Sequence, residues 1–234
     1  MAALVMCERH FRAMESAVPP PQWVPWLDRH NWRYVERLPS QALVQKLARL
    51  ITGLKTFDLL LGAGHLQELG SMMRSIDEIN QDILFISFGI IKNNWTSNHT
   101  SYLNYFWSEN KGGGECPVRR KTIRAFVHRA GGLVDTSTAD RVVREIYQTY
   151  SDYLHARSAP IMAMVVGPPA RFDLDGIADS EARKPYIEQA PSYFYRSIAS
   201  TAIMARTILP DALVTDIYTD VKNFETDNAE VLFA

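Results

Sequence analysis

The chain is poor in cysteine and has no long hydrophobic run. Only Cys7 and Cys116 occur among its 234 residues, far apart and in no CxxC arrangement. This argues against a disulfide framework and a cysteine-based zinc site, and it fits a reducing compartment. The longest apolar run covers residues 83–91, whereas a membrane-spanning helix needs about 20 residues. The first residues show no basic start followed by an apolar core, so no signal peptide is predicted. We therefore expect a soluble cytoplasmic protein that does not enter a membrane.

The chain also has little excess charge of either sign. It carries 25 basic and 26 acidic residues, which gives a net charge of −1. That balance provides no overall attraction to nucleic acid or to an anionic membrane. The densest basic patch consists of Arg119, Arg120, Lys121, Arg124 and Arg129. Short runs of this kind usually form a solvated helix face, so binding of nucleic acid stays open only through this patch.

Motifs that hold metals or cofactors are missing. The six histidines occur singly, and there is no HExxH, no Glu-x-x-His pair and no DxDxDG loop. No P-loop is present, no GxGxxG follows a strand, and the signatures of serine hydrolases and kinases are absent. The sequence therefore predicts no metal and no cofactor.

Helical periodicity is clearest in two consecutive segments. In residues 41–64 an apolar stripe recurs at intervals of three, four or seven, with Ser40 as the expected N-cap and Gly62 and Gly64 as the stop signal. A second apolar face follows in residues 65–92. Because the connection is short, we expect the two helices to fold back on each other as an antiparallel hairpin. The two stripes comprise Leu43, Leu47, Leu50, Leu54 and Leu61, and Leu66, Leu69, Met73, Ile76, Ile83 and Phe88.

Prolines and glycines divide the rest of the chain. Residues 5–16 are expected to form a short helix, and the four prolines within residues 19–25 favour an extended arm. The tryptophans in or after this arm are expected to cover the edge of the core, with a partner-binding surface as the alternative. They are Trp23, Trp26 and Trp32. Later helices are expected to be divided at Pro160, to start at Pro191 and to break at Pro210.

No segment alternates apolar and polar residues in the sustained way that is typical of strands. The sequence therefore predicts an all-α protein, a single-domain bundle of roughly six to eight helices. We expect a helix and a Pro/Trp-rich arm over residues 1–39, the bundle over 40–225 and a frayed tail over 226–234.

Two polar groups are candidates for a site. Arg74 and Glu78 lie four residues apart and share a helix face, with Asp77 beside them. They could form a paired site inside the bundle or an ordinary intrahelical salt bridge. His155 could act as an acid or base, or it could be a structural histidine that donates a hydrogen bond to a buried carboxylate. The residues around it that complete the second group are Tyr150, Ser151 and Arg157.

These motifs resemble those of a family of uncharacterised bacterial helical proteins. In that family one helix precedes a second that carries an Arg-x-x-x-Glu pair, here Arg74 and Glu78, and a later helix ends in a Tyr-Ser-x-Tyr-x-His element, here residues 150–155. The family looks distantly similar to HEPN domains, which are four-helix bundles often found in toxin and defence ribonucleases. Their catalytic pattern, Arg and then His after four to six residues, is not present here. The resemblance implies a bundle fold more than an activity.

Three hypotheses about function follow. The first is a helical protein of bacterial defence or stress type that binds a ligand or partner without catalysis. The second is a metal-independent, HEPN-like ribonuclease that uses His155 and Arg157 in a basic groove, across a homodimer. The third is a small-molecule pocket between helices, lined by Tyr102, Tyr105, Tyr150 and Tyr153.

Overall fold

The computed structural model describes residues 2–26, 28–108, 115–132, 147–177 and 180–232. The described chain is predominantly helical, with two small two-stranded sheets. This confirms the predicted all-α class. Among the described residues, no helix combines the length and the hydrophobicity that a membrane crossing would need.

The centre of the fold is the predicted pair of antiparallel helices, α2 (Pro39–Ala63) and α3 (Leu66–Ile91). Leu47, Leu50 and Leu54 on α2, and Leu69 and Ile76 on α3, are fully buried, as their spacing predicts. The turn between the helices is tight because Gly64 takes a left-handed conformation, with φ of 78°.

The start of α2 differs from the prediction. The helix begins at Pro39, and Leu38 rather than Ser40 is its N-cap. The side chain of Gln41 accepts a hydrogen bond from the backbone N–H of Leu38 at 2.9 Å. Its amide also donates to the carbonyl oxygen of Pro19 at 3.1 Å, which ties the proline-rich segment to α2.

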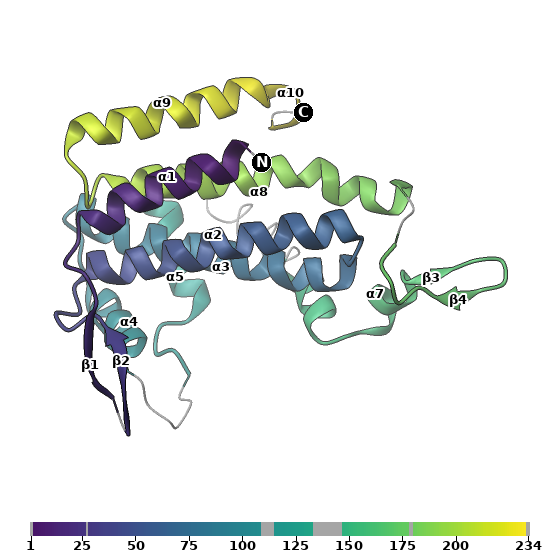
Figure 1. Ribbon diagram of the computed structural model, residues 1–234, viewed down its shortest axis with the longest axis horizontal. Coiled ribbons are helices and arrows are strands. Elements are labelled where there is room, and N and C mark those ends of the chain that lie inside the picture. The colour runs from purple at the N-terminus through teal and green to yellow at the C-terminus, as the bar shows by residue number, and fades with distance from the viewer. Residues whose placement is uncertain (1, 27, 109–114, 133–146, 178–179, 233–234) are drawn as a thin grey trace.

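Other helices pack around this pair in layers (Figure 1). One side of α2 and α3 carries α1 (Ala2–Ser16) and α8 (Ser180–Ala205), with α9 (Asp211–Asp227) and α10 (Ala229–Leu232) outside them. The remaining helical segments are α4 (Ser97–Trp107), α5 (Arg120–Ala130), residues 147–154 and α7 (Ser158–Met162).

The helices confirm some proline predictions and correct others. The helices break at Pro210, as predicted, and this residue is the N-cap of α9. The division expected at Pro160 falls earlier, at a non-helical step at residue 157, and Pro160 lies inside α7. Pro191 does not start a helix but lies inside α8, where residues further along, such as Ile198 and Met204, are buried against the core. Packing of this kind outweighs the loss of one backbone hydrogen bond.

Residues 226–232, predicted to be frayed, lie in α9 and α10, apart from Asn228 between them. The helix expected to be divided at Pro160 would begin near Thr136, and its residues 136–146 lie outside the described residues.

The expected extended arm is instead a β-hairpin. Strands β1 (Gln22–Trp26) and β2 (Arg29–Arg33) pair antiparallel, with Trp23 opposite Trp32. These tryptophans do not cover the core, since they are 56% and 59% exposed, and the side chain of Trp26 lies outside the described part. A second hairpin pairs β3 (Val165–Val166) with β4 (Arg171–Phe172). The two hairpins project from opposite ends of the molecule (Figure 1).

Candidate functional site

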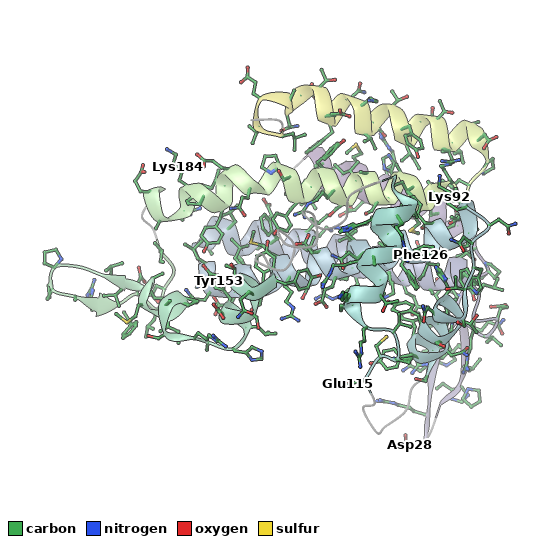
Figure 2. The ribbon with its side chains drawn as sticks, turned by 180° about the vertical axis from the view of Figure 1, so that it is seen from behind. Asp28, Lys92, Glu115, Phe126, Tyr153 and Lys184 are labelled. Atoms are coloured by element: carbon green, nitrogen blue, oxygen red, sulfur yellow. The ribbon has the colours of Figure 1, made fainter. Side chains whose placement is uncertain are left out.

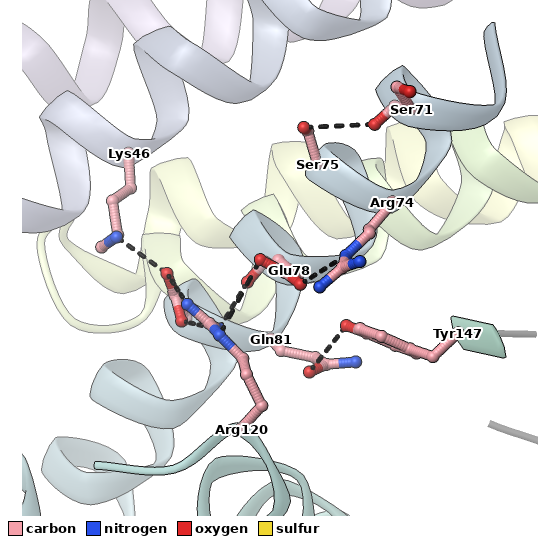
Figure 3. Close-up of polar contacts among 9 residues, drawn as sticks. Lys46, Ser71, Arg74, Ser75, Glu78, Gln81, Arg120 and Tyr147 are labelled. Atoms are coloured by element: carbon pink, nitrogen blue, oxygen red, sulfur yellow. Dashed lines mark hydrogen bonds and ion pairs between the residues drawn. The ribbon is translucent and has the colours of Figure 1, made fainter. Parts of the chain in front are cut away.

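The predicted Arg74–Glu78 pair is present on α3. The guanidinium Nε of Arg74 lies 3.0 Å from a carboxylate oxygen of Glu78, and both side chains are about one-quarter exposed. The pair is one end of a longer polar network that Figure 3 shows. Glu78 also lies 3.9 Å from the guanidinium of Arg120, which comes from α5. The pair is therefore neither isolated nor fully buried.

The network centres on Asp82, which sequence reasoning did not single out. Lys46 on α2 donates a hydrogen bond to this buried carboxylate at 2.8 Å, and Arg120 donates to both of its oxygens (Figure 3). Burial alone would raise the pKa of Asp82, but the charges of Lys46 and Arg120 outweigh burial and lower it. Asp82 is thus a carboxylate held by two cations, which suits a structural role better than proton transfer.

Asp77 forms a separate pair on another side of α3. It is almost fully buried, and Arg196 on α8 lies 2.9 Å from one of its oxygens. Burial raises the pKa of Asp77 to about 6, with Arg196 opposing the shift. Tyr150 is buried, and both burial and the charge of Asp77 raise the pKa of its phenol. The structure thus brings together only part of the predicted cluster.

His155 is exposed to solvent, not enclosed in a polar core. Its backbone N–H donates to the carbonyl oxygen of Ser151 at 2.9 Å, and within the described part of the chain its imidazole forms no hydrogen bond with Asp77 or Glu78. Arg157 is also exposed and pairs with Asp152 at 3.2 Å. The hypothesis that His155 donates to a buried carboxylate is therefore wrong.

The basic patch on α5 is not one continuous surface. Arg120 is engaged with Asp82, and Arg124 stacks over the ring of Tyr147 at 4.7 Å. Arg119, Lys121 and Arg129 are exposed. Tyr153, close in sequence to His155, and Phe126 on α5 are well separated in Figure 2. His155 and the basic patch therefore do not meet in one groove.

The four tyrosines predicted to line one pocket lie in different places. Tyr102 is buried, with the ammonium of Lys46 5.2 Å from its ring. The ring of Tyr153 lies against Gly70 on α3, and its hydroxyl is 2.6 Å from that of Tyr186. Tyr105 is 40% exposed. Because these contacts involve different elements, the expected aromatic pocket between helices is not formed.

A different aromatic cavity lies between the β1–β2 hairpin and α4. We call it the hairpin groove; its volume is about 750 Å³. Ligand sites for small molecules usually have volumes of roughly 300–1,000 Å³. The groove combines four aromatic rings with two arginines. Its lining is Pro21, Val24, Pro25, Trp32, Arg33, Tyr34, Val35, Arg37, Gln45, Phe106 and Trp107.

Local structure fixes the walls of the groove. Gln41 bonds both the proline-rich segment and, at 2.7 Å, the carboxylate of Glu36, so it holds the base of the hairpin to α2. On the opposite wall Phe106 packs edge-on against Trp107, with ring centroids 4.9 Å apart. The ammonium of Lys46 lies 4.9 Å from the Phe106 ring, which connects this wall to the Asp82 network.

The electrostatics of the groove favour a negatively charged ligand. Arg33 and Arg37 are its charged lining residues, and no carboxylate is among the described residues that line it. The indole N–H of Trp107 is buried and has no hydrogen-bond acceptor in the described part of the chain. The arrangement offers ring faces for stacking and two arginine side chains.

Sequence reasoning missed this site although a signal was present. His30, Trp32 and Tyr34 alternate, which is typical of a strand with one aromatic face. Four nearby prolines obscured the pattern. Comparisons of the chain with protein-family models, curated proteins and solved structures find no match. The site must therefore be interpreted from its own chemistry.

Proposed function

We propose that this protein is a binding protein and that the hairpin groove binds a planar, anionic ligand. The observation that carries this proposal is the combination of four aromatic rings with Arg33 and Arg37 in one cavity of about 750 Å³. Aromatic faces stack on planar groups, and arginine pairs with carboxylate, sulfonate or phosphate oxygens. A ligand with both features would use both parts of the lining.

Binding without catalysis fits the chemistry of the described residues. The ionisable lining residues of the groove are Arg33, Tyr34 and Arg37, none of which normally titrates near neutral pH. The carboxylates of the polar network, Glu78 and Asp82, are already paired with arginine or lysine. These groups support recognition and stability rather than acid–base chemistry.

A cytoplasmic, reducing setting is part of this proposal. Cys7 is buried and Cys116 is half-buried, and neither forms a disulfide. Thiols that stay free are typical of such a compartment. A role in bacterial defence or stress is the context that we propose from the family resemblance of residues 74–78 and 150–155.

A metal-independent ribonuclease is the second candidate, because His155 and Arg157 are both exposed. Arg157 is paired with Asp152, however, and Tyr153, two residues before His155, is well separated from Phe126 of α5 in Figure 2. Incubation of mixed RNA with the wild type and with His155→Ala tests this candidate. The binding proposal predicts no cleavage by either protein, whereas cleavage that His155→Ala abolishes would support the ribonuclease.

The binding proposal is tested with 8-anilinonaphthalene-1-sulfonate, an aromatic anion with a planar naphthalene ring. Its fluorescence is titrated against the wild type, Trp32→Ala and Arg37→Gln. We expect each substitution to weaken binding about tenfold, which corresponds to the loss of one stacking or charged contact. Circular dichroism spectra verify that each variant is folded.

Two matched variants control for general effects of exposed aromatic and basic residues. Phe172→Ala removes an exposed ring from the other hairpin, and Arg206→Gln removes an exposed arginine after α8. Both should bind the dye as the wild type does. If Trp32→Ala and Arg37→Gln also leave the affinity unchanged, the groove is not the site and the proposal fails.

A further inference from the structure

We propose that the natural ligand is a single strand of nucleic acid whose bases stack in the hairpin groove and along the outside of the hairpin. This inference rests on the proposed function of the groove and names the class of its ligand. It draws on a second set of residues outside the groove, which we call the outer aromatic face. They are Trp23 and His30; the ring of Trp23 contacts both His30 and the groove residue Trp32.

The outer aromatic face is a ready stacking surface. The rings of Trp23 and Trp32 lie 5.2 Å apart, and those of Trp23 and His30 lie 6.3 Å apart with an interplanar angle of 17°. Trp23 and Trp32 are more than half exposed. Large exposed aromatic clusters on a protein surface commonly mark interaction sites. The outer aromatic face is contiguous with the groove, because the ring of Trp23 lies against that of the groove residue Trp32.

The spacing of the rings suits a strand better than one nucleotide. His30, Trp32 and Tyr34 occur at every second position, so their backbone positions are roughly 6.8 Å apart along the chain. One base can cover only one such position. The groove adds the rings of Phe106 and Trp107. A ligand that uses this whole track must carry several bases in succession, as a flexible single strand does.

The charges near the track can receive a phosphate backbone. Arg29 and Arg37 form no ion pair within the described part of the chain, and Arg33 lines the groove. The carboxylate of Glu36 already accepts a hydrogen bond from Gln41. Single-strand binding combines such cations with aromatic platforms, and every base presents a face that can stack. Phosphate contacts by Arg29 and Arg37 predict a log–log dependence of affinity on salt with a slope of about −1.4.

This arrangement differs from binding through the α5 patch. Two of the five basic residues in that patch are engaged inside the protein, Arg120 with Asp82 and Arg124 with Tyr147. Its helix presents Ile123, Phe126 and Val127 to the core, not to solvent. The hairpin, by contrast, offers exposed rings and cations together.

The test compares ligands of increasing length by fluorescence anisotropy. The probes are a labelled single-stranded oligothymidylate of about twelve residues, the matching oligouridylate, thymidine monophosphate and a duplex of the same length. We expect both single strands to bind at least tenfold more tightly than the mononucleotide or the duplex. Polyglutamate serves as an anionic polymer without bases and should not compete.

Trp23→Ala is the deciding variant, because Trp23 belongs to the outer aromatic face and is not among the lining residues of the groove. We expect it to weaken single-strand binding about tenfold, as stacking losses do, and to leave the affinities for thymidine monophosphate and for the anilinonaphthalene dye unchanged. Phe172→Ala, the matched control, should bind every probe as the wild type does. Sedimentation velocity should give the same oligomeric state for both variants and the wild type.

The outcomes separate this inference from the proposed function. If dye binding depends on Trp32 but single strands bind no better than the mononucleotide, ligand binding in the groove is supported. The inference that the ligand is a single strand of nucleic acid is then wrong. If neither binds, both fail. Four other results would also contradict single-strand binding. Trp23→Ala could have no effect, weaken the binding of all probes alike or dissociate a dimer, or polyglutamate could compete with the single strands.

Discussion

Arg120 on α5 donates hydrogen bonds to both carboxylate oxygens of Asp82 on α3. Lys46 on α2 bonds the same carboxylate and lies against Phe106 of α4. One buried acid thus connects four helices, and the last of them carries a wall of the hairpin groove. The ion-pair network therefore contacts a wall of the proposed ligand site through Lys46 and Phe106.

Asp82→Ala should lower the free energy of unfolding by about 3–5 kcal/mol, because it leaves Lys46 and Arg120 without their shared acceptor. The side chains of Asp82 and Lys46 are 5% and 13% exposed, so solvent replaces little of the lost interaction. Urea unfolding measures the change. The control is Asp152→Ala, which breaks the more exposed pair with Arg157 and should cost less than about 1 kcal/mol. Equal losses in the two variants would contradict the central role of Asp82.

Asp77 should make the protein less stable as pH rises. Burial raises its pKa from 3.8 to about 6, so between these values the folded state binds more protons than the unfolded state. The free energy of unfolding then falls as pH rises through this window. Asp77→Asn removes the effect and should stabilise the protein at pH 7.5 by up to about 3 kcal/mol. Its partner Arg196 is 47% exposed and can be solvated when the charge is lost.

The difference in stability between wild type and Asp77→Asn, measured by urea unfolding from pH 4 to 7.5, tests this prediction. The difference should grow with pH and level off above pH 6. A variant that is less stable than the wild type at pH 7.5 would show that the ion pair with Arg196 outweighs burial.

Two glycines should respond to alanine in opposite directions. A Cβ atom at Gly89 would lie 2.7 Å from Nε2 of the fully buried His99, whose ring stacks on Phe85 at 3.9 Å. Gly89→Ala should therefore destabilise the protein by about 1–3 kcal/mol. Gly62, near the end of α2, has no neighbouring atom within 4 Å of such a Cβ. Gly62→Ala should stabilise it by up to about 1 kcal/mol through helix propensity. Thermal melts that shift in the same direction would contradict this packing.

The helices of the core could be predicted because their evidence is local. The spacing of Leu47, Leu50 and Leu54 is enough to define the buried face of α2, and Gly64 marks its end. The Arg74–Glu78 pair was also predictable, since a separation of four residues places both on one face. Asp82 was not, because its partners Lys46 and Arg120 are 36 and 38 residues away in the chain.

The groove could not be predicted for a related reason. Trp32 and Trp107 line one cavity only because α2, α4 and the hairpin assemble, and the prolines before and within β1 hide the strand pattern. For His155 the sequence left two interpretations open, and among the described residues its imidazole forms no hydrogen bond with Asp77 or Glu78. A residue whose partners are distant in the sequence can be assigned a role only when the tertiary structure is known.

Photo-crosslinking tests the central claim most directly. A single-stranded oligonucleotide that carries 5-iodouracil is irradiated with the protein, and the crosslinked peptides are identified by mass spectrometry. The account predicts crosslinks to the peptides that contain Trp23, Trp32 or Trp107, reduced in Trp32→Ala. Crosslinks confined to residues 119–129 of the α5 region, unchanged in Trp32→Ala, would contradict it.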